Sequence, residues 1–359
     1  MKLPKLDDLV GEQIAIYEMP ADTPLFVVGP PGSGKTSLAV LRCNHLNQLK
    51  TDCSVVTRNR MLAALSSQLG APTSTMHELV SKDYWDTFSR KISEDHGYIY
   101  DWTRLAESYK SKDLQPKREH LIVDEGQNLP KGFFSWVLQH GAESATVFAD
   151  EDQTTDSQRA TLPDICAAGF PNPIRLTKNH RNTAQIAALA EHFHKSAVLA
   201  PGVVPASRTG EKPRLHECTS LSEFSDQVAL RYKNRGGSIG VILCSVQDVQ
   251  TMYSLLQTRV PDGARLDYYT SANPNLSRST QVLQPGITVL TSESVIGLEF
   301  DTVYLQDLAR SLPCSTLDDY RRMYMLCARA RQSLMLVNGP SPLSAAQLAS
   351  LPGPAILDR

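Results

Sequence analysis

Short, wholly apolar segments alternate along the chain with longer segments in which apolar residues recur at helical spacing. Residues 25–28 (LFVV) and 238–245 (SIGVILCS) have the length and apolar composition of buried parallel strands. A helical pattern follows each of them, at 37–49 and at 246–256. Because strand and helix patterns alternate in both halves of the chain, the sequence predicts an α/β fold with two domains that contain parallel sheets.

The other predicted elements continue this alternation. Helices are expected at 11–16, 61–69, 184–191 and 321–331, and strands at 55–57, 120–123, 146–149, 287–291, 302–305 and 333–337. The segment Gly-Phe-Pro-Asn-Pro at 169–173 interrupts the periodicity, as Gly- and Pro-rich segments do between elements. We therefore predict a first domain at residues 1–170, with a small helical insertion at about 80–119, and a second domain at 171–359.

A phosphate-binding loop is predicted between the first strand and the helix that begins at Ser37. The segment reads Gly29-Pro30-Pro31-Gly32-Ser33-Gly34-Lys35-Thr36 and matches the pattern G-x-x-x-x-G-K-[ST] at every position. Its glycines let backbone N–H groups close around phosphate oxygens, and the helix N-terminus adds partial positive charge. Lys35 would neutralise the β- and γ-phosphates, and Thr36 would hold a Mg²⁺ ion. The alternative is a Gly-Pro turn that matches by chance, which the strand–loop–helix context disfavours.

Two predicted strands end in acidic residues. Asp124 and Glu125 follow the strand 120–123, and the acidic turn that ends at Gln153 follows the strand 146–149. Ligands bind at the carboxyl ends of strands in open α/β sheets. Asp124 is therefore predicted to hold Mg²⁺ through water, and Glu125 to orient and deprotonate an attacking water. Gln153 would sense the γ-phosphate. A purely structural role would require both strands to end in acids by chance.

Aromatic residues and cations are interleaved in residues 80–119. Such a pattern suits stacking on the bases of a single strand. In the alternative interpretation, the segment is a small helical insertion whose aromatic residues form its own core and whose cations are solvated; for any single residue this second interpretation is favoured. The aromatic residues concerned are Tyr84, Trp85, Phe88, Tyr98, Tyr100, Trp102 and Tyr109.

Composition narrows the class of protein. The 359 residues carry a formal net charge of −2, so any basic surface that binds nucleic acid must be local. Seven scattered cysteines without a C-x-x-C pair argue against a zinc site or iron–sulfur cluster, and they indicate reduced thiols. No apolar run approaches the length of a membrane span, and no signal-peptide pattern is present at the N-terminus. We expect a cytoplasmic protein with no membrane partner.

The order of the motifs resembles that of superfamily 1 helicases of the UvrD/Rep type over nearly the whole chain. GPPGSGKT (29–36) is similar to their first motif, VDEGQ (123–127) to the D-E-x-Q box and ADEDQ (149–153) to the third motif. Three segments of the second domain resemble later motifs: LTKNHRN (176–182), LTSESVIGLEFD (290–301) and YMLCARAR (324–331). The resemblance implies two RecA-like P-loop NTPase domains with parallel sheets and an ATP site at their interface.

The resemblance also implies roles for individual residues in binding ATP. Gln13 would read the adenine, because its amide is both donor and acceptor. His180 would stack on the base, and Glu299 would contact the ribose. Arg181 and Arg329 would be arginine fingers that stabilise the transition state at the γ-phosphate.

Two further segments of the first domain resemble motifs that contact a nucleic-acid strand. They are Arg58-Asn59-Arg60, which ends a predicted strand, and the segment that contains Thr75 and His77. Taken alone, a basic residue at a strand end is usually solvated and a lone histidine is usually structural. The order of the motifs favours contacts with single-stranded nucleic acid, with DNA favoured over RNA.

The implied function is that of an ATP-dependent nucleic-acid translocase or helicase with a single-strand-stimulated ATPase and 3′–5′ polarity. Several positions depart from the family pattern: Glu293 replaces the usual His, Ile296 the usual Lys, Ala328 a Thr and Ala149 a Gly. The ATP site is thus better preserved than the positions that contact the strand. Hydrolysis is therefore implied more strongly than unwinding.

Chain length indicates a minimal form of such a helicase. The intervals from Lys35 to Asp124 and from Arg181 to Gly297 leave room for only a reduced first insertion and none for a second. A partner protein, a nuclease or other effector, would supply the missing contacts. The alternative is an ATP-gated nucleic-acid-sensing or regulatory subunit with little unwinding activity. A P-loop kinase or GTPase would explain the first motif only.

Overall fold

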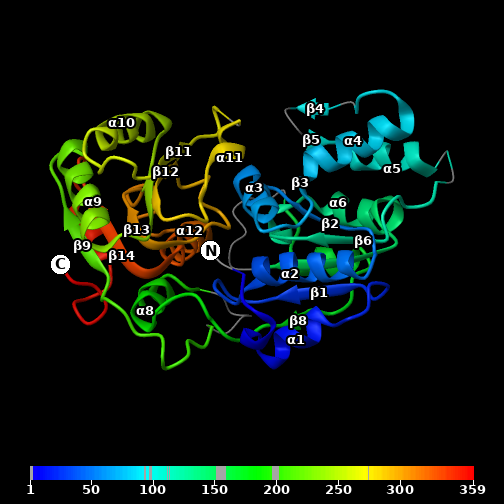
Figure 1. The fold of residues 1–359 in the computed structure, drawn as a ribbon, viewed down its shortest axis with the longest axis horizontal. Helices are drawn as coiled ribbons and strands as arrows, with labels where there is room; N and C mark the ends of the chain where they lie inside the picture. The colour runs from blue at the N-terminus through cyan, green and yellow to red at the C-terminus, as the bar shows by residue number, and fades with distance from the viewer. Residues whose placement is uncertain are drawn as a thin grey trace. The chain divides into compact units, whose positions relative to one another are not determined.

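The computed structural model describes residues 3–92, 94–96, 99–110, 112, 114–150, 159–195, 202–273 and 275–359. They divide into two compact units, each described by itself (Figure 1). The N-terminal unit contains the residues up to Gly29 and Gly34–Leu176, and the C-terminal unit contains Pro30–Ser33 and Thr177–Arg359.

The N-terminal unit is built on a six-stranded parallel sheet with the strand order β3-β2-β6-β7-β1-β8. The strands are β1 (Leu25–Val28), β2 (Cys53–Thr57), β3 (Thr73–Thr75), β6 (His120–Val123), β7 (Ser144–Ala149) and β8 (Ile174–Arg175). A short pair, β4 (Glu94–His96) and β5 (Ile99–Tyr100), lies apart from this sheet.

Helices pack against the sheet and form the two apolar cores of this unit together with the strands. They are α1 (Gly11–Tyr17), α2 (Lys35–Gln48), α3 (Arg60–Gln68), α4 (Met76–Phe88), α5 (Trp102–Lys110), α6 (Lys131–Trp136) and α7 (Leu162–Ala167), with short turns at Leu6–Asp8, Gly126–Asn128 and Val137–Gly141. Phe26 and Val28 belong to one core, and Leu25 and Val27 to the other. Because successive side chains of a strand point to opposite faces, both faces of β1 are buried and the strand is apolar throughout.

Most aromatic residues of the segment 80–119 are part of the core. Tyr84, Tyr100 and Tyr109 are buried in the same apolar cluster as Trp136. The Tyr109 hydroxyl donates a 2.8 Å hydrogen bond to Asp83 Oδ1. These residues are therefore structural, as the second interpretation expected, but they join the core on the main sheet and do not form a separate core of the insertion. Trp85 is 52% exposed, and Tyr98 lies outside the described residues.

The first sheet extends past the domain boundary predicted at residue 170. β8 pairs in parallel with β1, in the register Val27 with Ile174 and Val28 with Arg175. The N-terminal unit therefore continues to Leu176. The Pro-rich segment at 169–173 is a loop inside this unit, because the chain makes one more short strand after it.

The C-terminal unit contains a second six-stranded parallel sheet with the order β11-β12-β10-β13-β14-β9. Its strands are β9 (Arg214–Glu217), β10 (Ser238–Leu243), β11 (Leu266–Tyr269), β12 (Gly286–Thr291), β13 (Phe300–Leu305) and β14 (Ala330–Asn338). Its helices are α8 (Ala184–His192), α9 (Leu221–Arg235), α10 (Val246–Gln257), α11 (Leu276–Ser279), α12 (Leu317–Cys327) and α13 (Ala345–Ala349).

The ends of α12 differ from the helix predicted at 321–331. Thr316 caps the helix: its side chain accepts a hydrogen bond from Asp319 N, while the Asp319 carboxylate accepts from Thr316 N. This capping box fixes the start of the helix ahead of its basic residues. The helix ends at Cys327, and β14 begins at Ala330.

The predicted fold class is confirmed: both units are α/β, with parallel sheets and alternating helices, as in RecA-like P-loop NTPase domains. None of the helices in the part of the chain that the structure describes has the length and apolar composition of a membrane span.

Candidate nucleotide and nucleic-acid sites

The predicted phosphate loop connects β1 to α2. Gly29 follows the strand directly, Pro30, Pro31, Gly32 and Ser33 form the tip, and Ser37 lies in the first turn of α2. Gly32 and Gly34 have φ angles of 85° and 87°, which L side chains rarely adopt. The pattern of glycines is thus required by the backbone conformation of the loop.

Lys35 points back along its own loop. Its Nζ donates a 2.5 Å hydrogen bond to Gly29 O and lies 3.5 Å from Asp150 Oδ2. Gln13 lies beside the same loop, because a Cβ built on Gly34 would be 3.0 Å from Gln13 Nε2. The structure therefore brings Gln13, which is far upstream of Lys35, to the start of α2.

The two acidic strand ends lie at the same edge of the first sheet as this loop, since β7 lies between β6 and β1. Asp124 follows β6 and is 1% exposed. Burial raises the pKa of Asp124 above its ordinary range, the charge of Glu125 acts in the same direction, and a hydrogen bond from Thr36 and the charge of Lys35 oppose them. Glu125 has a φ of 57°, which is uncommon for a residue with a side chain and often marks a functional site.

Gln127 and Asp150 belong to this site, although the sequence alone predicts no role for either of them. Gln127 Nε2 donates a 2.6 Å hydrogen bond to Glu125 Oε2, and Gln127 Oε1 accepts one of 2.9 Å from Asp150 N. Gln127 therefore connects the end of β6 to the end of β7 and orients Glu125. Both residues stand in the motifs VDEGQ and ADEDQ, but their contact could not be predicted without knowing that β6 pairs with β7. Gln153 lies outside the described residues.

The residues present fit a hard divalent cation. Asp124 Oδ2 is buried and has no hydrogen-bond partner among the described residues, and the Thr36 hydroxyl contacts the same carboxylate. Mg²⁺ binds through one or two carboxylates, waters and substrate phosphates. It therefore needs no cluster of three His, Cys, Asp or Glu side chains, and the described residues contain none.

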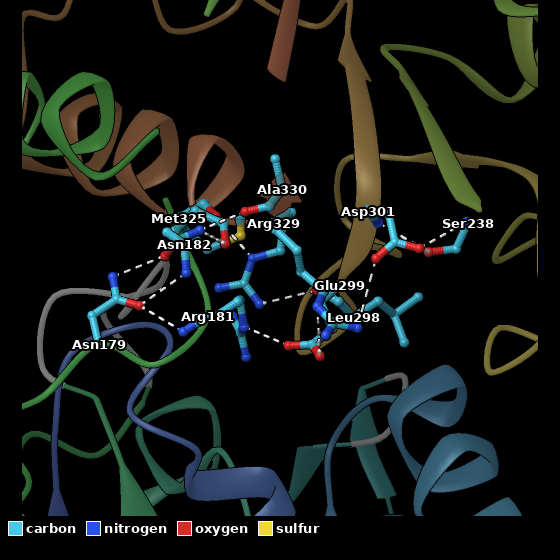
Figure 2. A network of polar contacts seen from close by, with 12 residues as sticks. Asn179, Arg181, Asn182, Ser238, Leu298, Glu299, Asp301, Met325, Arg329 and Ala330 are labelled. Carbon is cyan, nitrogen blue, oxygen red and sulfur yellow. Dashed lines mark hydrogen bonds and ion pairs between the residues drawn. The ribbon is translucent and has the colours of Figure 1, made fainter. Parts of the chain in front are cut away.

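The nucleotide-contacting candidates of the second domain form one network within the C-terminal unit (Figure 2). Asn179 Oδ1 accepts hydrogen bonds from the backbone N–H groups of Arg181 and Asn182, each 3.1 Å. Asn182 Nδ2 donates to Ala328 O and Ala330 O, at 3.1 and 2.5 Å. These two asparagines, also without a predicted role, bring the segment of His180 and Arg181 to the end of α12.

Arg329 is almost fully buried within this network. Its Nε donates a 2.8 Å hydrogen bond to Met325 O, and its Nη1 lies 3.5 Å from Leu298 O. Arg181 forms an ion pair with Glu299 (Figure 2). Burial acts to raise the pKa of Glu299, but Arg181 and Arg331 hold it below its ordinary value. Glu299 is therefore an anion that holds the predicted finger Arg181 in place.

The nucleic-acid candidates lie at the carboxyl ends of β2 and β3, and two of them also stabilise helix ends. Asn59 Oδ1 accepts a 2.8 Å hydrogen bond from Met61 N, and Thr75 Oγ1 one of 3.3 Å from Glu78 N. Arg58 and Arg60 are exposed, and His77 contacts the Tyr100 ring edge-on. Asn59 and Thr75 thus have a capping role whether or not they contact a strand.

Several solved structures that this chain matches are described as helicases. The arterivirus nonstructural protein 10 helicase is 16% identical, with a TM-score of 0.41, and the match covers 96% of this chain and 65% of that one. The PRRSV helicase is 13% identical with a TM-score of 0.44, covering 94% and 56%. The C-terminal domain of a possible DNA helicase from Lactobacillus plantarum WCFS1 is 22% identical with a TM-score of 0.35, covering 50% and 96%. The chain thus spans 56 to 65% of the length of the two viral helicases.

Family profiles match both parts of the chain, although no curated protein sequence matches it. An AAA domain profile matches residues 12–158, and the profile described as "Viral superfamily 1 RNA helicase core domain" matches residues 100–338. The predicted superfamily and enzyme class, a helicase-like nucleotide hydrolase that uses a divalent metal and binds nucleic acid, are confirmed at this level, whereas the UvrD/Rep type stays a prediction. Because the second match covers more than half of the 359 residues, the chain belongs to the family of viral superfamily 1 RNA helicase core domains.

Proposed function

We propose that this protein is an ATP-dependent translocase or helicase of the UvrD/Rep type that acts on single-stranded nucleic acid with 3′–5′ polarity. The observation that carries the proposal is the group of polar side chains at one edge of the first sheet. There Lys35, Thr36, Asp124 and Glu125 come together, and a buried Asp124 oxygen has no hydrogen-bond partner among the described residues.

Each residue of this group has a distinct task in the proposed reaction. Lys35 and the backbone of the loop bind the phosphates, and Thr36 and Asp124 hold the metal, for which we propose Mg²⁺. When bound, Mg²⁺ neutralises charge on the phosphates. Glu125 accepts the proton of the attacking water, and Gln127 orients its carboxylate through the 2.6 Å hydrogen bond. Gln13 is the proposed adenine contact.

The network of the C-terminal unit supplies the remaining nucleotide contacts in this proposal. Arg181 and Arg329 stabilise charge on the γ-phosphate, His180 stacks on the base, and Glu299 contacts the ribose. The ion pair between Arg181 and Glu299 keeps the guanidinium ordered before ATP is bound.

Arg58, Arg60 and His77 are the proposed contacts to the strand in the first domain. We favour DNA over RNA because of the UvrD/Rep resemblance, although the matched family is described as one of RNA helicases. A partner protein, a nuclease or other effector, would supply contacts that the short insertion at 80–119 lacks. A cytoplasmic location is proposed from the scattered cysteines.

The deciding experiment measures the rate of ATP hydrolysis with and without single-stranded DNA and RNA. A higher rate of ATP hydrolysis with one of the two strands at low salt supports the proposal and identifies the polymer. Hydrolysis that neither strand changes would contradict a translocase. Processive unwinding of a long duplex by the monomer alone would contradict the need for a partner.

The second candidate is an ATP-gated sensor subunit with slow turnover and little unwinding. It is favoured by the acidic residue Glu293 close to the carboxyl end of β12, where a family member usually has a histidine and where the chain pairs Glu293 with two arginines. A directional strand-displacement assay separates the two functions, since only the translocase displaces an annealed strand.

A further inference from the structure

Four charged side chains and a serine form a compact network in the C-terminal unit, and none of them is a predicted nucleotide contact. Glu293 Oε1 accepts hydrogen bonds from both Arg310 Nη1 and Arg322 Nη1, the second at 3.3 Å. Arg322 Nη2 binds Asp307 Oδ2 and Ser292 Oγ. Ser292 Oγ donates a 2.5 Å hydrogen bond to Asp307 Oδ2. The two arginines and two carboxylates balance in charge.

The two arginines differ in what holds them. Arg322 is anchored, because its partner Asp307 is only 2% exposed and lies close after β13. Arg310 is 60% exposed and has Glu293 as its partner, which is itself 51% exposed. An exposed ion pair of this kind contributes little to stability, because water screens it and both side chains lose freedom. The ion pair between Glu293 and Arg310 is therefore weak enough for a competing anion to replace it, while Arg322 is still held by Asp307.

The network lies where an open α/β sheet presents ligand-binding groups. Ser292 and Glu293 directly follow β12, Asp307 comes soon after β13, and these strands flank β10 on its two sides. The carboxyl ends of parallel strands meet at one edge, outside which ligands bind. One oxygen of Glu293 is shared by two guanidinium groups, and phosphate oxygens accept the same fork of N–H donors.

We propose that Arg310 and Arg322 form a phosphate-binding site for the nucleic-acid strand and that Glu293 occupies this site as an internal competitor. A backbone phosphate replaces the Glu293 carboxylate on the two guanidinium groups, while Asp307 continues to position Arg322. The inference rests on the proposed function, because the phosphate belongs to the strand. Glu293 thereby lowers the affinity of the protein for the strand.

The test is equilibrium binding of a fluorescent oligo-deoxythymidine and an oligo-uridine by the full chain over a series of salt concentrations. Glu293→Gln removes the competing charge and keeps the side-chain shape, so we expect roughly three- to ten-fold tighter binding and a salt dependence steeper by about 0.7 per added phosphate contact. Arg310→Gln should weaken binding and flatten the salt dependence. The double variant should lose most of the gain that Glu293→Gln shows alone.

A matched control separates the site from net charge. Asp226→Asn also removes one carboxylate from an exposed ion pair, because Asp226 Oδ1 lies 2.6 Å from Arg259 Nε in the same unit. It should change binding much less than Glu293→Gln. Equal tightening by both variants, or no tightening by Glu293→Gln in a chain that binds the strand, overturns the inference and leaves the proposed function standing. Absence of binding by every variant overturns both. Arg310→Gln alters an exposed side chain, so the test does not depend on one variant folding.

Discussion

Acidification should destabilise the N-terminal unit through His120, the first residue of the strand that delivers Asp124 and Glu125. His120 is fully buried: Nδ1 lies 2.6 Å from Ala21 O, and Nε2 lies 2.9 Å from Thr146 Oγ1. Thr146 Oγ1 also accepts a hydrogen bond from Arg42 Nε. Burial, and then the charge of Arg42, lower the pKa of His120 from 6.5 to about 4, although the Ala21 carbonyl acts in the opposite direction. The folded state therefore keeps the imidazole neutral.

The sign and magnitude follow from proton linkage. Between these two pKa values the unfolded chain binds a proton that the folded chain does not, so stability is present above pH 6.5 and is lost as the pH falls towards 4. One pKa unit corresponds to about 1.4 kcal/mol, which gives a total loss of about 3 kcal/mol and roughly 2 kcal/mol between about pH 7 and pH 5. This is a large part of the free energy of unfolding of a typical domain.

The assay is urea unfolding followed by tryptophan fluorescence at these two pH values. All three tryptophans, Trp85, Trp102 and Trp136, lie in the N-terminal unit, so the signal reports that unit alone. His120→Gln replaces the imidazole with an amide, which can donate and accept hydrogen bonds but does not titrate in this range. We expect the wild type to lose roughly 2 kcal/mol more than His120→Gln on acidification. Equal losses in the free energy of unfolding of the two proteins would refute the conclusion that the imidazole is neutral in the folded state.

Three other predictions concern the proposed reaction. Glu125→Gln should abolish steady-state hydrolysis of ATP while fluorescent-nucleotide binding persists, and turnover at the wild-type rate would remove Glu125 as the base. Arg181→Ala and Arg329→Ala should each lower kcat on the order of 10³-fold, as arginine fingers do, and normal turnover of either variant would exclude that arginine as a finger. Arg58→Ala should weaken binding of a single strand and lower the slope of log K against log salt by about 0.7, and an unchanged slope would mean that Arg58 contacts no phosphate.

The local parts of the fold and of the first-domain site could be predicted because neighbouring residues encode them. The loop from Gly29 to Thr36 and the turn at Asp124 and Glu125 each follow directly from a strand that is visible as an apolar run. Their grouping was predictable from the general rule that parallel strands present ligands at their carboxyl ends. The fold class followed from the alternation of strand and helix periods.

The parts that could not be predicted depend on strand order and on long-range hydrogen bonds. Asp150 reaches Lys35 because β7 lies next to β1, and Gln127 connects two strand ends only because β6 pairs with β7. Asn182 binds carbonyl groups 146 and 148 residues away. Glu293 was visible as a departure from the family pattern, but its partners Arg310 and Arg322 were not, since tertiary structure alone brings them together.

The strand orders also govern how the chain can fold during synthesis. All six strands of the first sheet have been translated once β8, at residues 174–175, has emerged, so the N-terminal unit can form while the rest is still being made. In the second sheet, β9 at residues 214–217 pairs with β14 at residues 330–338, which is made last of its strands. The nascent chain therefore presents β9 with an unpaired edge for most of the synthesis of the C-terminal half, and such edges can pair with other chains. Ribosome-bound chains that end before residue 330 lack the strand that pairs with β9, so we expect them to aggregate more readily than the full chain.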